Sequence, residues 1–427
     1  MTIDDAPARP ADGRSVAART AGATSPSVLR SMNAAEVLRV AWEHDVVTAS
    51  DLIGATGLSR STIIGVCDEL LDRGWLRPLA DARSTDAYRK GRPARRWTLA
   101  HDAGCVVGVD AGQHHVTVSV ADLRGTPLGR AERRLDPDAL GAERRSVVGL
   151  VVEEALAAAH ATADRVLATV VGVPAPVDAH GASPAESASD FWQRVNPDYV
   201  GALHVGTSTV VVENDANLAA LAEGAAPHGL GTTSSVTLLA GERFGAGFVL
   251  DGALVRGARG AAGEMRLLDL VEGVGSADGI GAVLRDWARD ARAAGLVPRS
   301  SLLHDTPVGD LGAPVVLAAA DAGDPTALEL VERLAERLAR IGTVLSSVLD
   351  VDRIIVAGAV APSIGLLVER TSPRLAALSQ REPPEVLASR LGEHVVVLGA
   401  VAHAVAHVRE HALELTLPPG RTGGRDE

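Results

Sequence analysis

Apolar residues recur every three to four positions between residues 32 and 73, which is the spacing of amphipathic helices. The segments with this pattern are separated by short polar stretches, and Thr56-Gly57-Leu58-Ser59 combines a glycine turn with a serine N-cap. Residues 1–29 have no periodicity and are rich in Ala, Arg, Ser, Thr and Pro, so they predict a flexible arm. The pattern predicts three helices, over 32–42, 49–55 and 60–73.

The last of these predicted helices has one apolar and one polar face. Two helices, a glycine turn and a third helix form the order of a helix-turn-helix, whose last helix enters the major groove of DNA. The alternative is a three-helix dimerisation or linker module with solvated charges. On the first interpretation, the residues that reach DNA at the start of the polar face are Ser59, Arg60, Ser61 and Thr62.

Two short segments after the helices, 75–78 and 95–99, predict the strands of a wing. Between them, Gly91-Arg92-Pro93 places Arg92 at a turn, and arginine is favoured in narrow A·T minor grooves. Arg95 and Arg96 are better placed to contact phosphates.

The distribution of charge supports a DNA-binding interpretation. The net charge of −13 argues against general affinity for nucleic acid, yet residues 1–100 carry 14 basic and 12 acidic side chains. Eight of these bases lie between residues 73 and 96, against two acids. A compact positive block ahead of an acidic body is typical of a small DNA-contacting module. We therefore expect residues 30–100 to form a winged helix-turn-helix domain that binds a double-stranded DNA operator.

From residue 104 onwards, strand-like apolar runs alternate with helical segments, which indicates an α/β body. The first half has strands on either side of an Asp110-Ala111-Gly112 turn and a third strand after Arg124-Gly125. The second half repeats this theme around a glycine-bearing turn over 241–247, which predicts two lobes around a cleft. The predicted strands of the body include 106–110, 115–122, 166–173, 208–212, 234–239, 248–250 and 353–356. The predicted helices cover 145–163, 279–294, 325–349 and 399–409.

The predicted strand over 208–212 leads into an abrupt polar corner, Glu213-Asn214-Asp215, followed by a helix-forming run. Side chains at the carboxyl ends of buried strands point into ligand crevices. An amide and a carboxylate at such a corner can hold a polyhydroxylated ligand, with Asp215 accepting a hydrogen bond from a hydroxyl. The alternative is that Asn214 and Asp215 only cap the following helix.

Composition narrows the class of protein. A chain of 427 residues predicts two to three domains, and its 46% hydrophobic but 2% aromatic content requires a core of Ala, Val and Leu. No apolar run approaches the roughly 18 residues of a membrane span, and the charged start is unlike a signal peptide, so we expect a cytoplasmic protein. Cys67 and Cys105 are too few for a disulfide framework or a four-cysteine zinc site.

Four motifs in this order resemble the ROK family (repressors, open reading frames and sugar kinases), and specifically its transcriptional-repressor branch. They are GVDAG…VADLRG (108–125), GVPAPVD (172–178), VENDANLAALAEG (212–224) and GALVRGARGAAGE (252–264). The resemblance implies an α/β, actin-like, two-lobed sugar-kinase fold with RNase H-like lobes, preceded by the α+β winged helix-turn-helix domain. We expect a flexible arm over 1–29, the DNA-binding domain over 30–100, lobe 1 over 101–228, lobe 2 over 229–412 with its final helix returning towards lobe 1, and a flexible tail over 413–427.

The resemblance also implies a sugar pocket between the lobes. In it Asn214 and Asp215 would hold sugar hydroxyls, and Glu264 would accept from another. In the family's kinases the residue that matches Asp215 is the general base, because a carboxylate can accept the proton of the attacking hydroxyl. An alternative for Glu264 is an ordinary exposed acid after a glycine-rich loop.

Departures from the family pattern point away from catalysis. The kinases carry Gly-Thr-Gly in the second phosphate loop, where this chain has Gly241-Glu242-Arg243, and Glu242 would repel phosphates. A Gly-Gly-Gly run of the nucleotide site becomes Ala357-Gly358-Ala359, and Leu267 replaces a histidine that would touch both sugar and zinc. The family's cysteine zinc loop is absent, so we expect no metal, no cofactor and no catalytic residue.

The sequence therefore predicts a ROK-type transcriptional regulator that represses carbohydrate genes and responds to a sugar or sugar derivative. Helix-turn-helix proteins read paired half-sites, so we expect a homodimer or higher homo-oligomer. Two alternatives stay open: an ATP-dependent sugar kinase, favoured by Asp110 and Asp215, and a regulator whose sugar pocket is vestigial, favoured by Leu267.

Overall fold

The structure is a computed structural model that describes residues 26–79, 95–185, 190–203, 208–225 and 234–418. Contacts divide the chain into two compact units. The first contains the residues up to Asp72 together with Leu76–Leu99, and the second contains Arg73–Trp75 and the residues from Ala100 onwards. No helix in these described ranges has both the length and the apolar composition that crossing a membrane requires.

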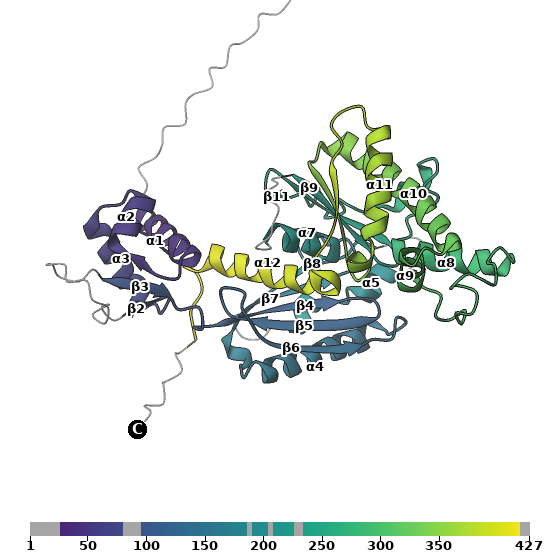
Figure 1. The fold of residues 1–427 in the computed structure, drawn as a ribbon. Helices are drawn as coiled ribbons and strands as arrows, with labels where there is room; N and C mark the ends of the chain where they lie inside the picture. The colour runs from purple at the N-terminus through teal and green to yellow at the C-terminus, as the bar shows by residue number, and fades with distance from the viewer. Residues whose placement is uncertain (1–25, 80–94, 186–189, 204–207, 226–233, 419–427) are drawn as a thin grey trace, which may run out of the picture. The chain divides into compact units, whose positions relative to one another are not determined.

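The N-terminal unit contains three helices and a small antiparallel sheet (Figure 1). The central strand of the sheet, β3, pairs with β1 on one side and β2 on the other. Leu38, Ile63 and Trp97 are almost fully buried, so helices and sheet share one core. The elements are α1 (Pro26–Glu43), β1 (Val47–Thr48), α2 (Ala49–Thr56), α3 (Arg60–Asp72), β2 (Leu76–Leu79) and β3 (Arg96–Leu99).

Local sequence fixes the ends of α2. The Thr48 hydroxyl accepts from the Asp51 backbone N–H at 3.3 Å, and the Asp51 carboxylate accepts from the Thr48 backbone N–H at 2.9 Å. These two bonds form a capping box that begins the helix. Gly57 ends it in the left-handed region, with φ of 69°.

The predicted arm over 1–29 is wrong for its last residues, because α1 begins at Pro26. Proline suits the first turn of a helix, where its missing N–H has no partner to lose. Residues 1–25 lie outside the described part of the chain, as do residues 419–427 of the predicted tail. The described start of that tail, up to residue 418, continues without helix or strand.

The first sheet of the larger unit has the order β6-β5-β4-β7-β8. The helix α4 covers the outer face of this sheet at β6, where Gly129 is needed because a Cβ there would lie 2.4 Å from the Ala159 backbone nitrogen. The elements of this lobe are β4 (Cys105–Ala111), β5 (His115–Ala121), β6 (Pro127–Arg134), α4 (Gly141–Ala158), β7 (Val166–Val173), α5 (Phe191–Val195), α6 (Tyr199–Leu203), β8 (Thr209–Asn214) and α7 (Asp215–Ala225).

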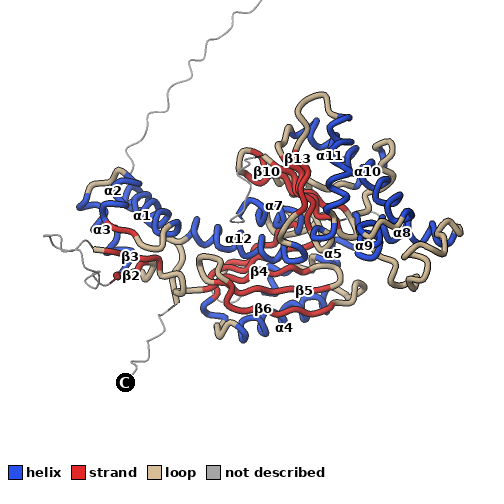
Figure 2. The backbone as a smooth tube through the Cα atoms, viewed as in Figure 1, coloured by secondary structure: helices blue, strands red, loops and turns tan. Residues whose placement is uncertain are grey.

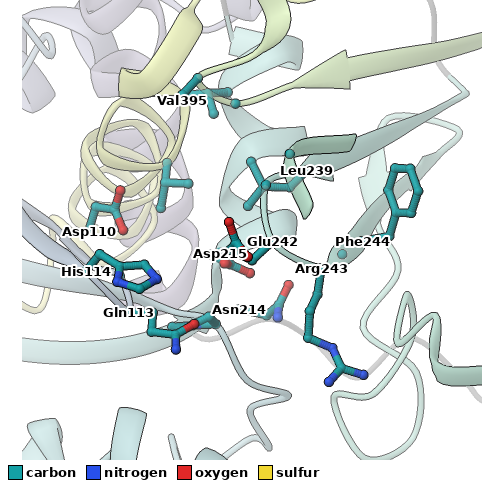
Figure 3. A pocket seen from close by; sticks show the side chains of 18 of the residues that line it. Asp110, Gln113, His114, Asn214, Asp215, Leu239, Glu242, Arg243, Phe244 and Val395 are labelled. Carbon is teal, nitrogen blue, oxygen red and sulfur yellow. The ribbon is translucent and has the colours of Figure 1, made fainter. Parts of the chain in front are cut away.

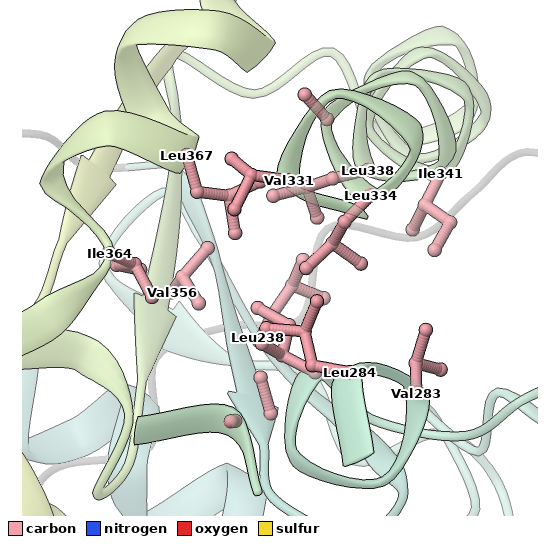
Figure 4. Close-up of a cluster of buried hydrophobic side chains, with 14 of the residues drawn as sticks. Leu238, Val283, Leu284, Val331, Leu334, Leu338, Ile341, Val356, Ile364 and Leu367 are labelled. Atoms are coloured by element: carbon pink, nitrogen blue, oxygen red, sulfur yellow. The ribbon is translucent and has the colours of Figure 1, made fainter. Parts of the chain in front are cut away.

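The second sheet has the order β11-β10-β9-β12-β13, and Leu, Val and Ile side chains from its strands and helices form a large apolar core (Figure 4). Short 3-10 turns η2 (Arg266–Leu270), η3 (Ala361–Ser363) and η4 (Gly392–His394) complete the loops. The elements are β9 (Ser235–Ala240), β10 (Phe244–Leu250), β11 (Ala253–Leu254), α8 (Ile280–Ala293), α9 (Ala313–Asp321), α10 (Pro325–Leu349), β12 (Arg353–Ala357), α11 (Gly365–Leu378), β13 (Glu385–Ala388) and α12 (Val395–His411).

The two sheets repeat one topology. In each, the first three strands of the sheet order are antiparallel and the last two run parallel to the third. Figure 2 shows the strands of both sheets in red. The helix α12 packs on β4 and β7, α7 packs on β9 and β10, and the two helices pack on each other. The close approach requires Gly399, since a Cβ there would lie 1.9 Å from the Leu218 carbonyl oxygen. The final helix thus returns to the first lobe.

Several predicted boundaries are wrong. The turn predicted over 241–247 is limited to 241–243, because Phe244 already pairs with Ala240 and begins β10. The helix predicted over 145–163 is Gly141–Ala158, and the one over 399–409 extends from Val395 to His411.

Candidate functional site

A cavity of about 470 Å³ lies between the two lobes of the larger unit. Figure 3 shows Asp110, Gln113 and His114 along one side of it and Glu242 and Arg243 across from them. The predicted sugar-binding residues Asn214, Asp215 and Glu264 all line this cavity. The structure therefore brings together three residues that are up to 50 positions apart in the sequence.

Asn214 and Asp215 close the end of β8 and begin α7. The Asn214 side-chain oxygen accepts from the Asn217 backbone N–H at 3.1 Å, and its amide nitrogen donates to the Ala175 carbonyl at 3.1 Å. Asp215 accepts from the Ala216 backbone N–H at 2.8 Å. The Asn214 side chain thus caps α7, and both side chains are held at the wall of the cavity.

Burial raises the pKa of Asp215 to about 8, and the nearby charges of Asp110 and Glu264 act in the same direction. A carboxyl group with this pKa is mostly protonated at neutral pH. Asp215 can then donate a hydrogen bond to a sugar oxygen through its O–H group while its other oxygen accepts, and after it loses its proton both oxygens only accept.

The buried acid Glu213 precedes Asn214 and holds the Asn214-Asp215 corner in place through hydrogen bonds. The sequence did not identify this role. The Glu213 carboxylate accepts from Arg256 Nε at 2.7 Å, from Asn217 Nδ2 at 2.9 Å and from the Asn214 backbone N–H at 2.9 Å. Its only signal in the sequence is a charged residue at the end of an apolar strand. We assign Glu213 to holding the corner in shape rather than to ligand binding.

Glu264 reaches the cavity because the preceding loop packs tightly. Gly263 has φ of 90°, and a Cβ there would lie 1.7 Å from the Ala246 carbonyl oxygen. This close approach lets Glu264 form a β-bridge with Gly245 of β10. Glu264 is an exposed acid after a glycine-rich loop, as the alternative interpretation expected, and its exposed side chain lines the cavity.

The turn over 241–243, which matches the family's second phosphate loop, contacts protein groups. The carboxylate of Glu242 forms an ion pair with Arg285 of α8 at 2.6 Å. The backbone amides of Gly279 and Gly281 are consumed by the carbonyls of Glu242 and Gly241, at 3.0 and 3.1 Å. The amides near this turn therefore bond to protein carbonyls, and Arg243 lines the cavity with its side chain.

The first loop is similarly occupied by protein groups. Asp110 Oδ2 lies 3.2 Å from His115 Nε2, and this contact raises the pKa of His115. The buried guanidinium of Arg144 donates to the carbonyls of Gly112 and Gln113 at 3.1 and 3.0 Å. Arg144 fixes the loop from behind, and no periodic signal in the sequence predicts this contact.

A second buried arginine, Arg337 of α10, supports the cavity wall at Phe244. It donates to the carbonyls of Val274, Ser276 and Asp278 at 2.7–2.8 Å, and its guanidinium lies 5.2 Å from the centre of the Phe244 ring. Phe244 lines the cavity, and its backbone N–H donates to the carbonyl of Ala277 in the same loop.

Two aromatic residues at the cavity wall, Phe191 and Trp192 of α5, were missed by the sequence analysis. The guanidinium of Arg266, in η2, lies 5.4 Å from the centre of the Trp192 ring. Trp is the more useful signal, since this chain has only five, and an aromatic face is a common platform for a sugar ring. The described ranges contain no group of three or more His, Cys, Asp or Glu side chains placed to hold a metal ion.

The predicted DNA-binding residues lie in the N-terminal unit. Ser59, Arg60 and Ser61 are exposed at the start of α3, and Thr62 is half-buried. The Ser59 hydroxyl accepts from the Thr62 backbone N–H at 3.2 Å and caps the helix. The other predicted contacts are less uniform: Arg95 pairs with Asp68 at 3.3 Å, Arg96 is half-buried in β3, and Arg92 lies outside the described residues.

Comparison with known proteins agrees with this architecture. The ROK family model matches residues 106–268 and 303–407, more than half of the chain. A candidate xylose repressor from Caldicellulosiruptor sp. (strain Rt8B.4) is 22% identical over 400 residues, which cover 89% of this chain and 97% of that protein.

Two solved structures extend the comparison. A ROK family transcriptional regulator, a homolog of the E. coli MLC protein, superposes with a TM-score of 0.71 at 20% identity, over 91% of this chain and 99% of that one. A ROK family glucokinase from Streptomyces griseus, in complex with glucose and AMPPNP, has a TM-score of 0.56 at 25% identity, over 70% and 98% of the two chains. The predicted fold class, a two-lobed sugar-kinase-like body after an N-terminal helix-turn-helix domain, is confirmed. The chain therefore belongs to the ROK family.

Proposed function

We propose that this protein is a transcriptional repressor that binds operator DNA through α3 and responds to a sugar or sugar derivative in the cavity between its lobes. Asn214, Asp215 and Glu264 hold the ligand, and Arg60 and Ser61 read base edges. The protein carries out no phosphotransfer. It acts as a homodimer or higher homo-oligomer, because helix-turn-helix proteins read paired half-sites.

The observation that carries this proposal is a helix-turn-helix unit with an exposed polar recognition face in the same chain as a ROK body. A sugar kinase does not need such a unit, whereas a repressor must have one. The xylose repressor of Caldicellulosiruptor bescii, 22% identical over 245 residues, also favours regulation over catalysis.

The second candidate function is an ATP-dependent sugar kinase. It is favoured by Asp110 and Asp215, which line one cavity, and by the 25% identity to a glucokinase. The Glu242–Arg285 ion pair and the Asp110–His115 contact argue against it, because both engage side chains of the turns that match the kinases' phosphate loops. A third candidate is a regulator with a vestigial pocket that responds to a protein partner.

Selection of DNA sequences from a random pool by the full chain separates these functions. The repressor predicts enrichment of one sequence, and a sugar from a carbohydrate panel then changes the affinity of the wild-type chain for it. The matched control is Asp215→Ala, which keeps DNA affinity within a few-fold and loses the sugar response, because the two sites are coupled but distinct. Failure to enrich any sequence would contradict the repressor, and an unaltered response in Asp215→Ala would favour the vestigial pocket.

A further inference from the structure

A second cavity, of about 480 Å³, adjoins the first along the β4–β5 loop. The two cavities share His114, His115, Ala359 and Glu393 in their walls. A single ligand can therefore extend from Asp215 in the first cavity past the two histidines into the second.

The floor of the second cavity is one face of the first sheet. His115 pairs with Arg134 and Thr117 with Glu132 across β5 and β6, and all four line the cavity. Side chains alternate along a strand, so the intervening Arg133 lies on the other face. There it forms an ion pair with Glu154 of α4.

The acids of this cavity have basic partners. Arg130 donates to Glu132 at 3.1 Å and to His394 Nδ1 at 3.0 Å. Glu393 lies 3.8 Å from Nε2 of His394.

One base of this cavity has no such partner. Arg134 is exposed and has no hydrogen-bond or ion-pair partner among the residues that the structure describes. The guanidinium of Arg134 is therefore open to a ligand, in a cavity that the imidazoles of His114 and His115 also line.

We propose that the second cavity binds an anionic group, phosphate or carboxylate, carried by the sugar derivative whose ring lies in the first cavity. The inference rests on the proposed function and specifies its ligand as a sugar phosphate or sugar acid. A guanidinium matches the geometry of either anion through two parallel N–H···O bonds. The histidines at the shared wall add donors beside the bond that joins ring and anion.

Calorimetric titration of the full chain tests this inference. The probes are glucose and xylose, glucose 6-phosphate and xylose 5-phosphate, glucuronate, and inorganic phosphate. At least one charged derivative should bind roughly ten-fold or more tightly than its neutral parent, because charge-assisted hydrogen bonds are about twice as strong as neutral ones. Whether phosphate or carboxylate gives the larger gain identifies the anion.

Two variants locate the effect. Arg134→Gln should abolish the advantage of the charged sugar and leave the affinity for the neutral one unchanged, and Arg134→Lys should restore part of it. The matched control is Arg133→Gln, one residue along the same strand on the opposite face, which should keep the advantage. Equal binding of neutral and charged sugars, binding of no anion, or an advantage that persists in Arg134→Gln would each overturn the proposal.

Operator binding measured with the same probes separates this inference from the proposed function. A response to a neutral sugar alone leaves the repressor standing and overturns only the anion site. Anion binding that requires Arg134 but never changes operator affinity supports the anion site and counts against a sugar-responsive repressor.

Discussion

At the scale of single residues, the protonation state of Asp215 decides what the sugar site can do. Its backbone contact with Ala216 favours the charged form, but burial and the charges of Asp110 and Glu264 outweigh it, and the pKa rises to about 8. The protonated form of Asp215 can donate to an acceptor oxygen of the ligand, whereas the ionised form can only accept from its hydroxyls. Sugar binding should therefore be coupled to pH between neutrality and about 8.

The same pKa predicts a stability difference in Asp215→Asn. The folded protein binds the Asp215 proton more tightly than the unfolded chain, so the stabilisation is complete below about pH 4 and is lost as pH rises through about 8. Asparagine does not ionise, so the stability of the variant relative to the wild type should rise between pH 4 and pH 8.5, and at pH 8.5 the variant should be the more stable. We expect a gain above about 1.4 kcal/mol, the value of one pKa unit. Denaturant unfolding at both pH values measures it, and an equal difference at the two would contradict the raised pKa.

Two arginines of the N-terminal unit should behave differently. Arg60→Ala at the start of α3 should cost roughly 1–3 kcal/mol at its own base pair and relax sequence preference there. Arg95→Ala should weaken all sequences alike and lower the salt slope by about one unit, because Arg95 releases counterions at a phosphate. Binding curves on a set of single-base operator variants at several salt concentrations distinguish the two. Equal loss on all sequences for Arg60→Ala would contradict base reading by α3.

At the scale of elements, the loop over 272–278 packs behind Phe244 of the cavity wall and has little regular structure of its own. Arg337 holds the loop by donating hydrogen bonds to three of the loop's carbonyls. Burial lowers the pKa of Arg337 to about 10, so the guanidinium stays charged at neutral pH. The loop in turn holds Phe244 through the carbonyl of Ala277. The shape of the second phosphate loop therefore depends on a residue of α10.

Arg337→Met should destabilise the protein by about 2–4 kcal/mol, since each buried polar group left without a partner costs roughly 1–3 kcal/mol. Arg340→Met is the matched control on the same helix, because Arg340 contacts the Glu272 carbonyl but is only half-buried, and it should cost much less. The midpoint of urea unfolding measures both. Similar midpoints for the two variants would show that the loop does not depend on Arg337.

Elements with strong periodicity were predictable, and those without it were not. The sequence alone predicted α3 from its apolar stripe, β4 and β7 from their β-branched runs, and the corner at Asn214-Asp215. The start of α12 was missed because Val395-Val396-Val397 is a strand-like run whose helical state is set by packing on α7.

The candidate site follows the same rule. The residues at strand ends could be found from sequence, because a strand places its last side chains at the crevice. Trp192 and Arg266 reach the cavity from short elements whose position depends on tertiary packing. Glu213, Arg144 and Arg337 are buried charges held by long-range hydrogen bonds, and nothing in the spacing of a sequence predicts such partners.

At the scale of the whole molecule, the two lobes enclose a cavity, and the turns that match the kinases' phosphate loops form contacts with other protein groups. We therefore expect no sugar phosphate above background when the protein is incubated with ATP and a hexose panel. Turnover near the roughly 1–100 s⁻¹ usual for kinases would contradict a purely regulatory function. Glu242→Thr combined with Arg243→Gly tests the cause, because restoring only this loop should not restore activity while His115 still contacts Asp110.

The central claim is a division of labour between the N-terminal unit, which binds DNA, and the body, which senses a sugar. Equilibrium binding of one selected operator, with and without the responding sugar, tests it most directly in three proteins: the wild type, Arg60→Ala and Asp215→Ala. We predict that Arg60→Ala binds the operator more weakly but binds the sugar normally. Asp215→Ala should bind the operator within a few-fold of the wild type and no longer respond to the sugar. The opposite pattern, in which Asp215→Ala loses the operator or Arg60→Ala binds it unchanged, would contradict the account.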